Sequence, residues 1–210
     1  MGREPPPISW LARPAENHPL IEAAGARGQL PRWAHLGPDR EAHSRRVAGL
    51  LDEWARKRGE EEAERVRWCA AGLLHDALKG SDPDELRIWA AGEWAEPLLH
   101  GPAIAGRLRE AGVRDEGLLL ALSYHSVGHP AFPPIGDYLY LADFLDPGRK
   151  ARYARADALR DRLPAAPHAA LLEVVPQRLR HLLDRRRAIV PDSIEYWNRL
   201  VREAEERPSP

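Results

Sequence analysis

The sequence predicts an all-α protein, a helical bundle of roughly eight or nine helices. Most segments repeat their apolar residues every three or four positions, as amphipathic helices do. Alternation of apolar and polar residues over strand lengths is scarce, and no Asn-Gly or Asp-Gly pair marks a hairpin turn. The chain has 210 residues, 43% apolar and 30% charged, which is enough for one domain with a sizeable core.

Residues 1–37 are rich in proline, glycine and alanine, and predict an N-terminal arm that is irregular or forms short helices. The first long helix is expected from about Asp39 to Arg58, with Gly59 as its stop signal. Its apolar residues share one face at helical spacing: Val47, Leu50, Leu51 and Trp54. His43 lies four residues before Val47, so its side chain is expected to point toward the core.

The second helix is expected over about 60–78 and becomes apolar on all sides through WCAAGLLHDAL, which is typical of a buried helix. The polar pair His75-Asp76 lies at its buried end. The chain's only cysteine, Cys69, excludes an internal disulfide and a cysteine-rich zinc site. Its apolar neighbours favour a buried thiol.

Start and stop signals predict the remaining helices. Asp82 as cap, Pro83 at the first position and Glu85 at the third predict a helix that runs to about Ala91. Three more helices are expected over about 101–111, 115–126 and 134–146. The proline-interrupted C-terminal part predicts two or three helices, the last from Asp192, its cap, to about Arg207.

Charge and hydropathy exclude some classes of partner. The formal net charge of -1 argues against nucleic-acid binding by the whole surface. Between Arg149 and Arg187 the chain has eleven Arg and Lys but four Asp and Glu; a solvated helical face is the preferred interpretation, and a basic rim that attracts a polyanionic substrate is the alternative. No apolar run is long enough to cross a bilayer or act as a signal peptide, so we expect a cytoplasmic protein.

Polar residues inside apolar helices need an explanation, because burial of an unpaired carboxylate is costly. Asp76 follows AAGLLH, and Asp143 lies on the inward side of DYLYLADFLD. Taken singly, such residues are more often hydrogen-bonded core histidines, helix caps or ion-pair partners than ligands. Taken together, His43, His75, Asp76 and Asp143 offer imidazole and carboxylate donors that suit a divalent metal such as Zn, Fe or Mn.

The order of these residues resembles the HD-domain metal-dependent phosphohydrolases, an all-α superfamily with an H…HD…D ligand set. Three further segments are similar to its YqeK-like branch, the symmetrical diadenosine tetraphosphate hydrolases: LLHGPAIAGRL with His100, SYHSVGHP with His125, and YLYLADFLDPGR with Asp143 and Arg149. The resemblance covers about 40–149, roughly half of the chain. Within an HD-type domain over 38–210, it implies a metal core over 39–149 followed by basic helices over 150–210.

The resemblance implies a centre with two metal ions. Iron is the expected metal, and Mn, Co and Zn are the alternatives. His43, His75, Asp76 and Asp143 would hold one ion, and Asp76 would bridge to a second ion held by His100 and His125. Asp76 and Lys79 are the expected catalytic residues. The expected substrate-binding residues are Arg40, Lys79, His129 and Arg149, each with a surface or capping role as its alternative.

Two residues depart from the pattern of the branch, namely His129 where relatives tend to have arginine and Asp137 where lysine is more usual. His129 is expected in a loop near the mouth of the pocket, because Gly128 and Pro130 interrupt the helix. Asp146 is interpreted as the end of its helix. The departures bear on substrate choice, whereas the metal-ligand set is complete.

The implied function is cleavage of a phosphoanhydride bond in a dinucleoside polyphosphate, such as diadenosine tetraphosphate, symmetrically to ADP. Two ions would activate water and neutralise the phosphate charge. The alternatives are another HD nucleotide phosphohydrolase or phosphodiesterase, such as a nucleoside phosphatase or a dNTPase, and a metal-stabilised nucleotide sensor without turnover. We expect a nucleotide as partner, no membrane and no nucleic acid, and a homodimer as one possible assembly.

Overall fold

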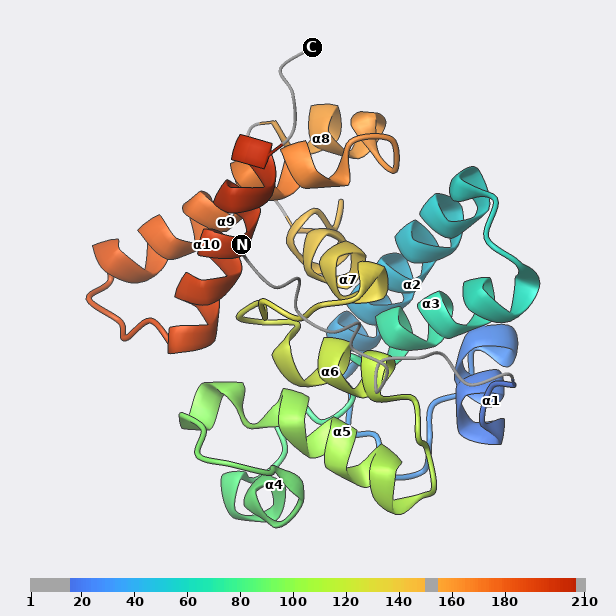
Figure 1. The fold of residues 1–210 in the computed structure, drawn as a ribbon. Helices are drawn as coiled ribbons and strands as arrows, with labels where there is room; N and C mark the ends of the chain where they lie inside the picture. Colours follow the sequence, from blue (N-terminus) through green and yellow to red (C-terminus); the bar gives the residue numbers. More distant parts are fainter. Residues whose placement is uncertain (1–15, 150–154, 207–210) are drawn as a thin grey trace, which may run out of the picture.

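Helix α7 (Pro134–Phe144) runs through the middle of the molecule, and helices from both halves of the chain pack around it (Figure 1). The computed structural model describes residues 16–149 and 155–206. This part of the chain is all-helical, which confirms the predicted fold class. Its ten α-helices exceed the eight or nine predicted, because the N-terminal arm contributes α1 (Pro19–Arg27).

Helices α2 (Pro38–Arg58) and α3 (Glu62–Leu74) form the closest helix pair and lie on one side of α7 (Figure 1). Gly72 permits this approach, since a Cβ there would lie 2.5 Å from the Cα of Ala48. Helix α2 has the predicted bounds and ends at Gly59, which adopts a left-handed conformation with φ of 76°. The pair therefore holds His43 and the end of α3 at a fixed separation.

Helix α3 ends at Leu74, four residues before the predicted end. Beyond it, the backbone makes tight turns in which Ala77 N–H donates to Leu74 and Lys79 N–H donates to Asp76. The apolar run continues through these turns, so the pattern alone overestimates the helix. The consequence is that Asp76 and Lys79 lie in a turn, where their side chains are not restricted to one helical face.

Helices α4 (Pro83–Trp89), α5 (His100–Glu110) and α6 (Glu116–Tyr124) continue the bundle below α7 in Figure 1. Asp82 caps α4 as predicted, and its carboxylate accepts hydrogen bonds from the backbone of Asp84 and Glu85. A 3-10 helix over Glu96–Leu98 leads into α5. Helices α4 and α6 each end about two residues before the predicted ends.

Gly128 ends the turn after α6 in a left-handed conformation with φ of 81°. A Cβ at this position would lie 2.2 Å from the ring of Tyr196, so the turn packs directly against α10 (Pro191–Glu206). Tyr196 also donates a 2.7 Å hydrogen bond to Asp137 of α7. The SYHSVGHP segment thus lies between the central helix and the C-terminal helices.

The C-terminal part contains α8 (Ala156–Arg162), α9 (Pro167–Asp184) and α10, three helices as expected. Pro176, one of the prolines of this part, lies inside α9 and does not interrupt it. The predicted cap of the last helix is wrong. Helix α10 begins at Pro191, so Asp192 lies in its first turn and is not its cap. The predicted end at Arg207 lies outside the described residues, as do residues 1–15 of the predicted arm.

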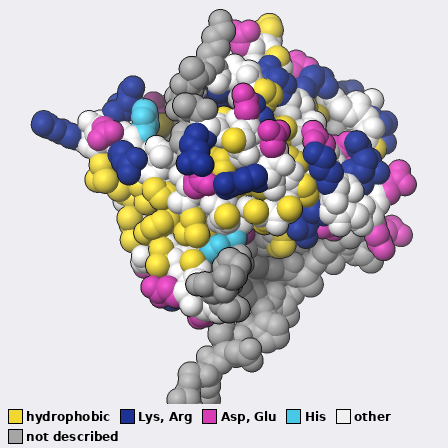
Figure 2. Space-filling view, turned by 90° about the horizontal axis from the view of Figure 1, so that it is seen from above, with side chains coloured by type: hydrophobic (Ala, Val, Ile, Leu, Met, Phe, Trp, Pro, Cys, Tyr) yellow, Lys and Arg dark blue, Asp and Glu magenta, His cyan; other side chains and the backbone are white. Residues whose placement is uncertain are grey.

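Several basic residues of this part form surface ion pairs. Arg160 pairs with Asp157, and Arg162 lies 2.7 Å from Glu173. Figure 2, which views the molecule from above, shows basic and acidic side chains interspersed over this face. These residues fit the interpretation as a solvated helical face.

Every helix within residues 16–149 and 155–206 is too short or too polar to span a bilayer.

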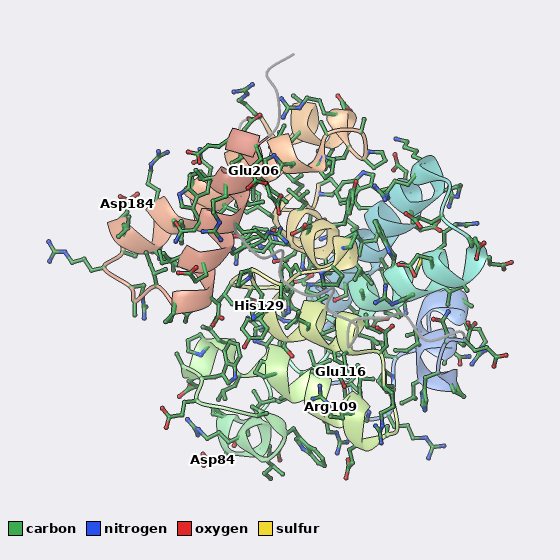
Figure 3. All side chains as sticks on the ribbon, in the orientation of Figure 1. Asp84, Arg109, Glu116, His129, Asp184 and Glu206 are labelled. Carbon is green, nitrogen blue, oxygen red and sulfur yellow. The ribbon has the colours of Figure 1, made fainter. Side chains whose placement is uncertain are left out.

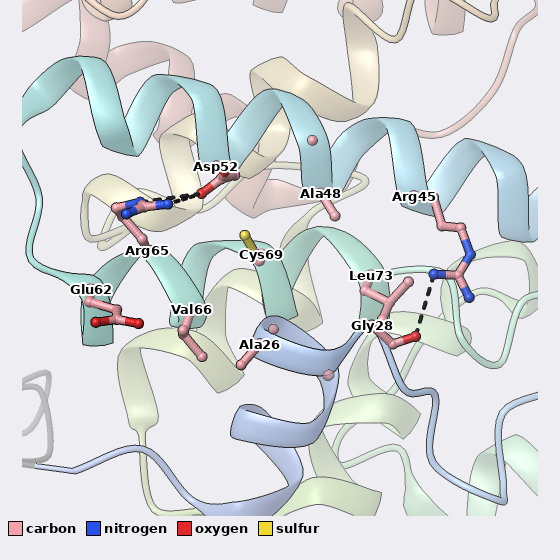
Figure 4. A pocket seen from close by; sticks show the side chains of 13 residues that line it. Ala26, Gly28, Arg45, Ala48, Asp52, Glu62, Arg65, Val66, Cys69 and Leu73 are labelled. Carbon is pink, nitrogen blue, oxygen red and sulfur yellow. Dashed lines mark hydrogen bonds and ion pairs between the residues drawn. The ribbon is translucent and has the colours of Figure 1, made fainter.

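A hollow of about 460 Å³ lies where α1, α2 and α3 meet (Figure 4). Alanine and glycine residues line much of it. Two polar contacts border it, one between Arg45 and the Gly28 carbonyl and one between Arg65 and Asp52. Cys69 lines the hollow and is only partly buried, although its apolar neighbours favoured a buried thiol. Burial still raises the pKa of the Cys69 thiol, which keeps it in the less reactive protonated form.

Candidate metal centre

Two histidines terminate helices in the same way and point into one buried cluster. His75 follows the last residue of α3, and its Nδ1 lies 2.8 Å from the Gly72 carbonyl. His125 follows the last residue of α6, and its Nδ1 lies 2.7 Å from the Leu122 carbonyl. A carbonyl can only accept, so each Nδ1 carries the hydrogen and each Nε2 is left with a lone pair. This is how protein metal sites orient imidazole ligands.

His43 of α2 is oriented by a carboxylate. Its Nδ1 lies 2.7 Å from Oδ2 of Asp146. The Asp146 carboxylate in turn accepts two hydrogen bonds from Arg46, at 2.7 Å to Oδ1 and 2.9 Å to Oδ2. Burial alone would raise the pKa of Asp146, but the bonds from Arg46 and His43 lower that pKa to about 2. Asp146 is therefore ionised and directs Nε2 of His43 into the cluster.

One half of the cluster consists of His43, His75 and Asp143. Nε2 of His43 lies 3.2 Å from Nε2 of His75 and 3.1 Å from Oδ1 of Asp143. The three donor atoms lie within 4.8 Å of one another, and all three residues are buried. Ligand atoms that share a tetrahedral metal at about 2.0–2.1 Å lie about 3.3 Å apart, so these donors fit one ion.

The other half consists of Asp76, His100 and His125. Nε2 of His100 lies 3.1 Å from Nε2 of His125 and 3.3 Å from Oδ1 of Asp76. Nε2 of His125 lies 3.6 Å from the same carboxylate oxygen, whereas the other oxygen of Asp76 faces Nε2 of His75 at 3.8 Å. Asp76 thus presents one oxygen to each half, which suits a bridging ligand.

The electrostatics differ among the donors of the cluster. Burial would lower the pKa of His75, but the nearby Asp76 and Asp143 raise that pKa. Burial lowers the pKa of His125, and burial together with the nearby His125 and Lys79 lowers that of His100 to about 4. Burial would raise the pKa of Asp143, but the bonds from His43 and His75 and the nearby Arg149 hold that pKa well below its usual range. Neutral imidazoles and ionised carboxylates are the forms that bind metals.

A cavity of about 570 Å³ opens beside the two carboxylates of the cluster. It is lined by Asp76, Asp143, Ser126 and four cationic side chains: Arg40, Lys79, Arg149 and Arg178. Nη1 of Arg40 lies 3.1 Å from Asp76, and Arg149 pairs with Asp143. Nζ of Lys79 lies 3.2 Å from a ring nitrogen of His100. Four cationic side chains beside two carboxylates that could hold metals suit a polyanionic ligand.

A second cavity of about 440 Å³ shares Arg40, Asp76 and Arg149 with the first and extends past His43 to Arg46 and Asp146. The two cavities therefore adjoin one another at Arg40, Asp76 and Arg149. All six predicted metal ligands and three of the predicted substrate-binding residues, Arg40, Lys79 and Arg149, come together around this centre.

The fourth predicted substrate-binding residue, His129, is not among the residues that line either cavity. It lies in a loop as predicted (Figure 3). Its ring packs on Tyr124, with centroids 4.5 Å apart, and its Nδ1 accepts a hydrogen bond from the backbone N–H of Ala131. Burial lowers the pKa of His129. Asp137, the other departure from the pattern, binds Tyr196 and Arg199 and braces α7 against α10.

Two residues of the site are not among the predicted ligands or substrate-binding residues. Asp146 follows the end of α7, in agreement with its interpretation as a helix end, but its contact with His43 was not predicted. Arg178 of α9 was predicted only as part of the basic segment. Both contacts depend on how helices far apart in the sequence pack, α2 against α7 for Asp146 and α9 against α7 for Arg178.

The geometry agrees with comparisons to known proteins. The sequence model of the HD domain family matches residues 40–163, more than half of the chain. The chain belongs to the HD domain family. Its solved relatives include a Clostridium acetobutylicum protein described as a predicted HD superfamily hydrolase involved in NAD metabolism, with a TM-score of 0.67 and 25% identity over 87% of this chain and 94% of that one.

Two similar proteins are each named symmetrical bis(5'-nucleosyl)-tetraphosphatase. The one from Halalkalibacterium halodurans is 25% identical over 178 residues, which cover 80% of this chain and 92% of the relative. The one from Bacillus subtilis is 28% identical over 140 residues, covering 62% of this chain and 74% of the relative. The predicted resemblance is confirmed, and the chain is an HD-domain hydrolase.

Proposed function

We propose that the chain is a metal-dependent phosphohydrolase that cleaves a phosphoanhydride bond in a dinucleoside polyphosphate, splitting diadenosine tetraphosphate into two ADP. The observation that carries this proposal is the convergence of six buried donor residues beside two cavities lined by cations. Two relatives named symmetrical bis(5'-nucleosyl)-tetraphosphatase support the choice of substrate.

In this proposal, one ion is held by His43, His75, Asp76 and Asp143, and a second by Asp76, His100 and His125. When bound, two such cations lower the pKa of water and neutralise the charge that moves during phosphoryl transfer. Imidazole and carboxylate donors suit Fe, Mn, Co and Zn, and iron is our first choice. The protein's part is to keep Asp76 ionised and every Nε2 directed inward.

The cationic residues position the polyphosphate in this scheme. Arg40 and Arg149 are shared by both cavities, so they are placed to bind the two phosphates that flank the bond to be cleaved. Lys79 lies in one cavity only, beside His100, and is placed to donate a hydrogen bond to a phosphate oxygen on that side. Together with Asp76 it is our proposed catalytic pair.

The pair of cavities supports a symmetric cut. A dinucleoside tetraphosphate has two phosphates and one nucleoside on each side of its central anhydride oxygen. Attack of water on one central phosphorus breaks its bond to that bridging oxygen, and both products are ADP. Two adjoining cavities beside one centre offer room for the two arms, whereas a single closed pocket would favour cleavage near an end.

A nucleotide panel with identification of the products tests this proposal. The full-length protein is loaded anaerobically with Fe, Mn or Co and given diadenosine tetraphosphate, ATP, dNTPs, nucleoside monophosphates and a cyclic dinucleotide. We expect ADP as the sole nucleotide product from diadenosine tetraphosphate, and no product from Asp76→Ala. Formation of AMP with ATP would contradict symmetric cleavage, and absence of turnover with every metal would favour a nucleotide sensor.

A further inference from the structure

Arg178 is the one residue of α9 among those that line the larger cavity. It lies outside residues 40–163, which match the HD domain family, and more than thirty residues beyond the predicted ligand Asp143. Other arginines of the basic segment pair with surface carboxylates, Arg160 with Asp157 and Arg162 with Glu173. Arg178 instead turns inward and is only 24% exposed. Arg178 therefore does not belong to the solvated helical face that the sequence predicts for the basic segment.

The guanidinium of Arg178 is held on two sides. Its Nη2 donates a 2.5 Å hydrogen bond to the Ser126 carbonyl, in the turn that follows the predicted ligand His125. Its Cζ lies 5.2 Å from the ring centroid of Tyr140, a geometry for cation–π attraction. Burial raises the pKa of Tyr140 to about 12, so this ring stays a neutral phenol. A guanidinium fixed in this way loses little entropy when it binds an anion.

The contact of Arg178 with Asp143 does not account for its position. Its Nη1 lies 3.8 Å from Oδ2 of Asp143, beyond hydrogen-bond distance. Asp143 already contacts His43, His75 and Arg149. The Nη1 edge of Arg178 therefore faces the cavity with N–H groups that can donate to a further oxygen. The same cavity holds Arg40, Lys79 and Arg149, so its lining has four cations for two carboxylates.

We propose that Arg178 binds a phosphate of the substrate's polyphosphate chain, on the side of the metal centre where Lys79 lies. Helix α9 would then complete a site whose other residues come from the HD-family region. The anion-binding role follows from the geometry around Arg178, and only the identity of the anion as a dinucleoside polyphosphate rests on the proposed function. Arg178 joins Arg40, Lys79 and Arg149 as a substrate-binding residue.

Inorganic tripolyphosphate is the probe for this role, because it presents phosphate oxygens without a nucleoside. Its binding to the metal-loaded, full-length protein is measured by calorimetry for the wild type and for Arg178→Gln. We expect the affinity to fall about 10- to 100-fold, as for loss of charge-assisted hydrogen bonds. Arg178→Lys, which keeps the charge without the planar fork, should lie between the two. Metal content should stay the same in all three proteins.

Arg180→Gln is the matched control, since it removes the same charge from an exposed position two residues further along α9. Its affinity for tripolyphosphate should equal that of the wild type. Unchanged binding by Arg178→Gln, loss of metal from it, or an equal effect of Arg180→Gln would each overturn the proposal. Absence of tripolyphosphate binding by the wild type would overturn it as well.

The two proposals can fail separately. If the wild type turns over no dinucleoside polyphosphate but its tripolyphosphate affinity depends on Arg178, the proposed function is wrong and the role of Arg178 stands. If the wild type releases ADP and Arg178→Gln leaves both KM and tripolyphosphate binding unchanged, Arg178 is only a brace between α9 and Ser126. Lower thermal stability of Arg178→Gln with wild-type binding would lead to the same conclusion.

Discussion

The two halves of the donor cluster differ in how their histidines are oriented. In the half with His43 and His75, the Nδ1 atoms face an ionised carboxylate and a backbone carbonyl, at 2.7 and 2.8 Å. In the half with His100 and His125, His125 is held by a carbonyl, but His100 has Nζ of Lys79 within 3.3 Å of both ring nitrogens. A carboxylate partner strengthens a histidine ligand, whereas a neighbouring ammonium group repels a metal cation.

The difference teaches that one ion should be held more tightly than the other. The first half is braced by Asp146 and Arg46, which orient the donor atom of His43 before metal binds. The second half shares its space with Lys79, which also lines the cavity where we propose that substrate phosphate binds. Bound phosphate would draw Lys79 away from His100, so the second ion and the substrate should stabilise each other.

Asp76→Ala should have the largest effect, because this carboxylate faces both halves and its loss removes a donor from each ion. We expect a fall in kcat of about 10³-fold or more, equivalent to at least about 4 kcal/mol of transition-state stabilisation. His75→Ala should be inactive as well. Product formation and metal content are measured together, and an Asp76→Ala protein that keeps two ions and full activity would show that the carboxylate is no ligand.

His100→Ala should separate the halves. We expect it to retain one metal ion per chain and to lose the second, with activity close to background, because His100 contacts only Asp76 and His125 among the predicted ligands. Metal analysis after gel filtration measures this. Loss of both ions would mean that the two halves bind metal as one unit. This result would contradict the proposed difference between the halves.

Asp146→Asn should weaken the tighter half without removing a ligand. The amide keeps the shape of the carboxylate but provides a weaker acceptor for Nδ1 of His43, so metal affinity should fall about 10- to 100-fold. Competition with a chelator measures the affinity. Asp157→Asn, an exposed carboxylate of α8 that pairs with Arg160, is the control and should leave the affinity unchanged.

His129→Gln should have the smallest effect. Because His129 packs on Tyr124 and is absent from the lining of both cavities, we expect kcat/KM to change less than about 3-fold. A large rise in KM with unchanged metal content would show that His129 binds substrate, as the sequence predicts.

The sequence was sufficient for the parts of the site that depend on local pattern. His43 was assigned to the core from helical spacing, and the polar pair His75-Asp76 was identified because buried carboxylates require a partner. The end of α3 was missed because the apolar run continues past Leu74 while the backbone turns. Arg178 was missed for another reason: it meets Ser126 only through the packing of helices far apart in the sequence.

The central claim is that the six donors form two unequal metal sites. Metal content of the wild type, reconstituted anaerobically with Fe(II) and followed by mass spectrometry during dialysis against a chelator, tests this claim most directly. We expect two ions per chain at the start, one lost early and one late, with the early loss slowed by tripolyphosphate. One ion at the start, or a single phase for both, would contradict the claim.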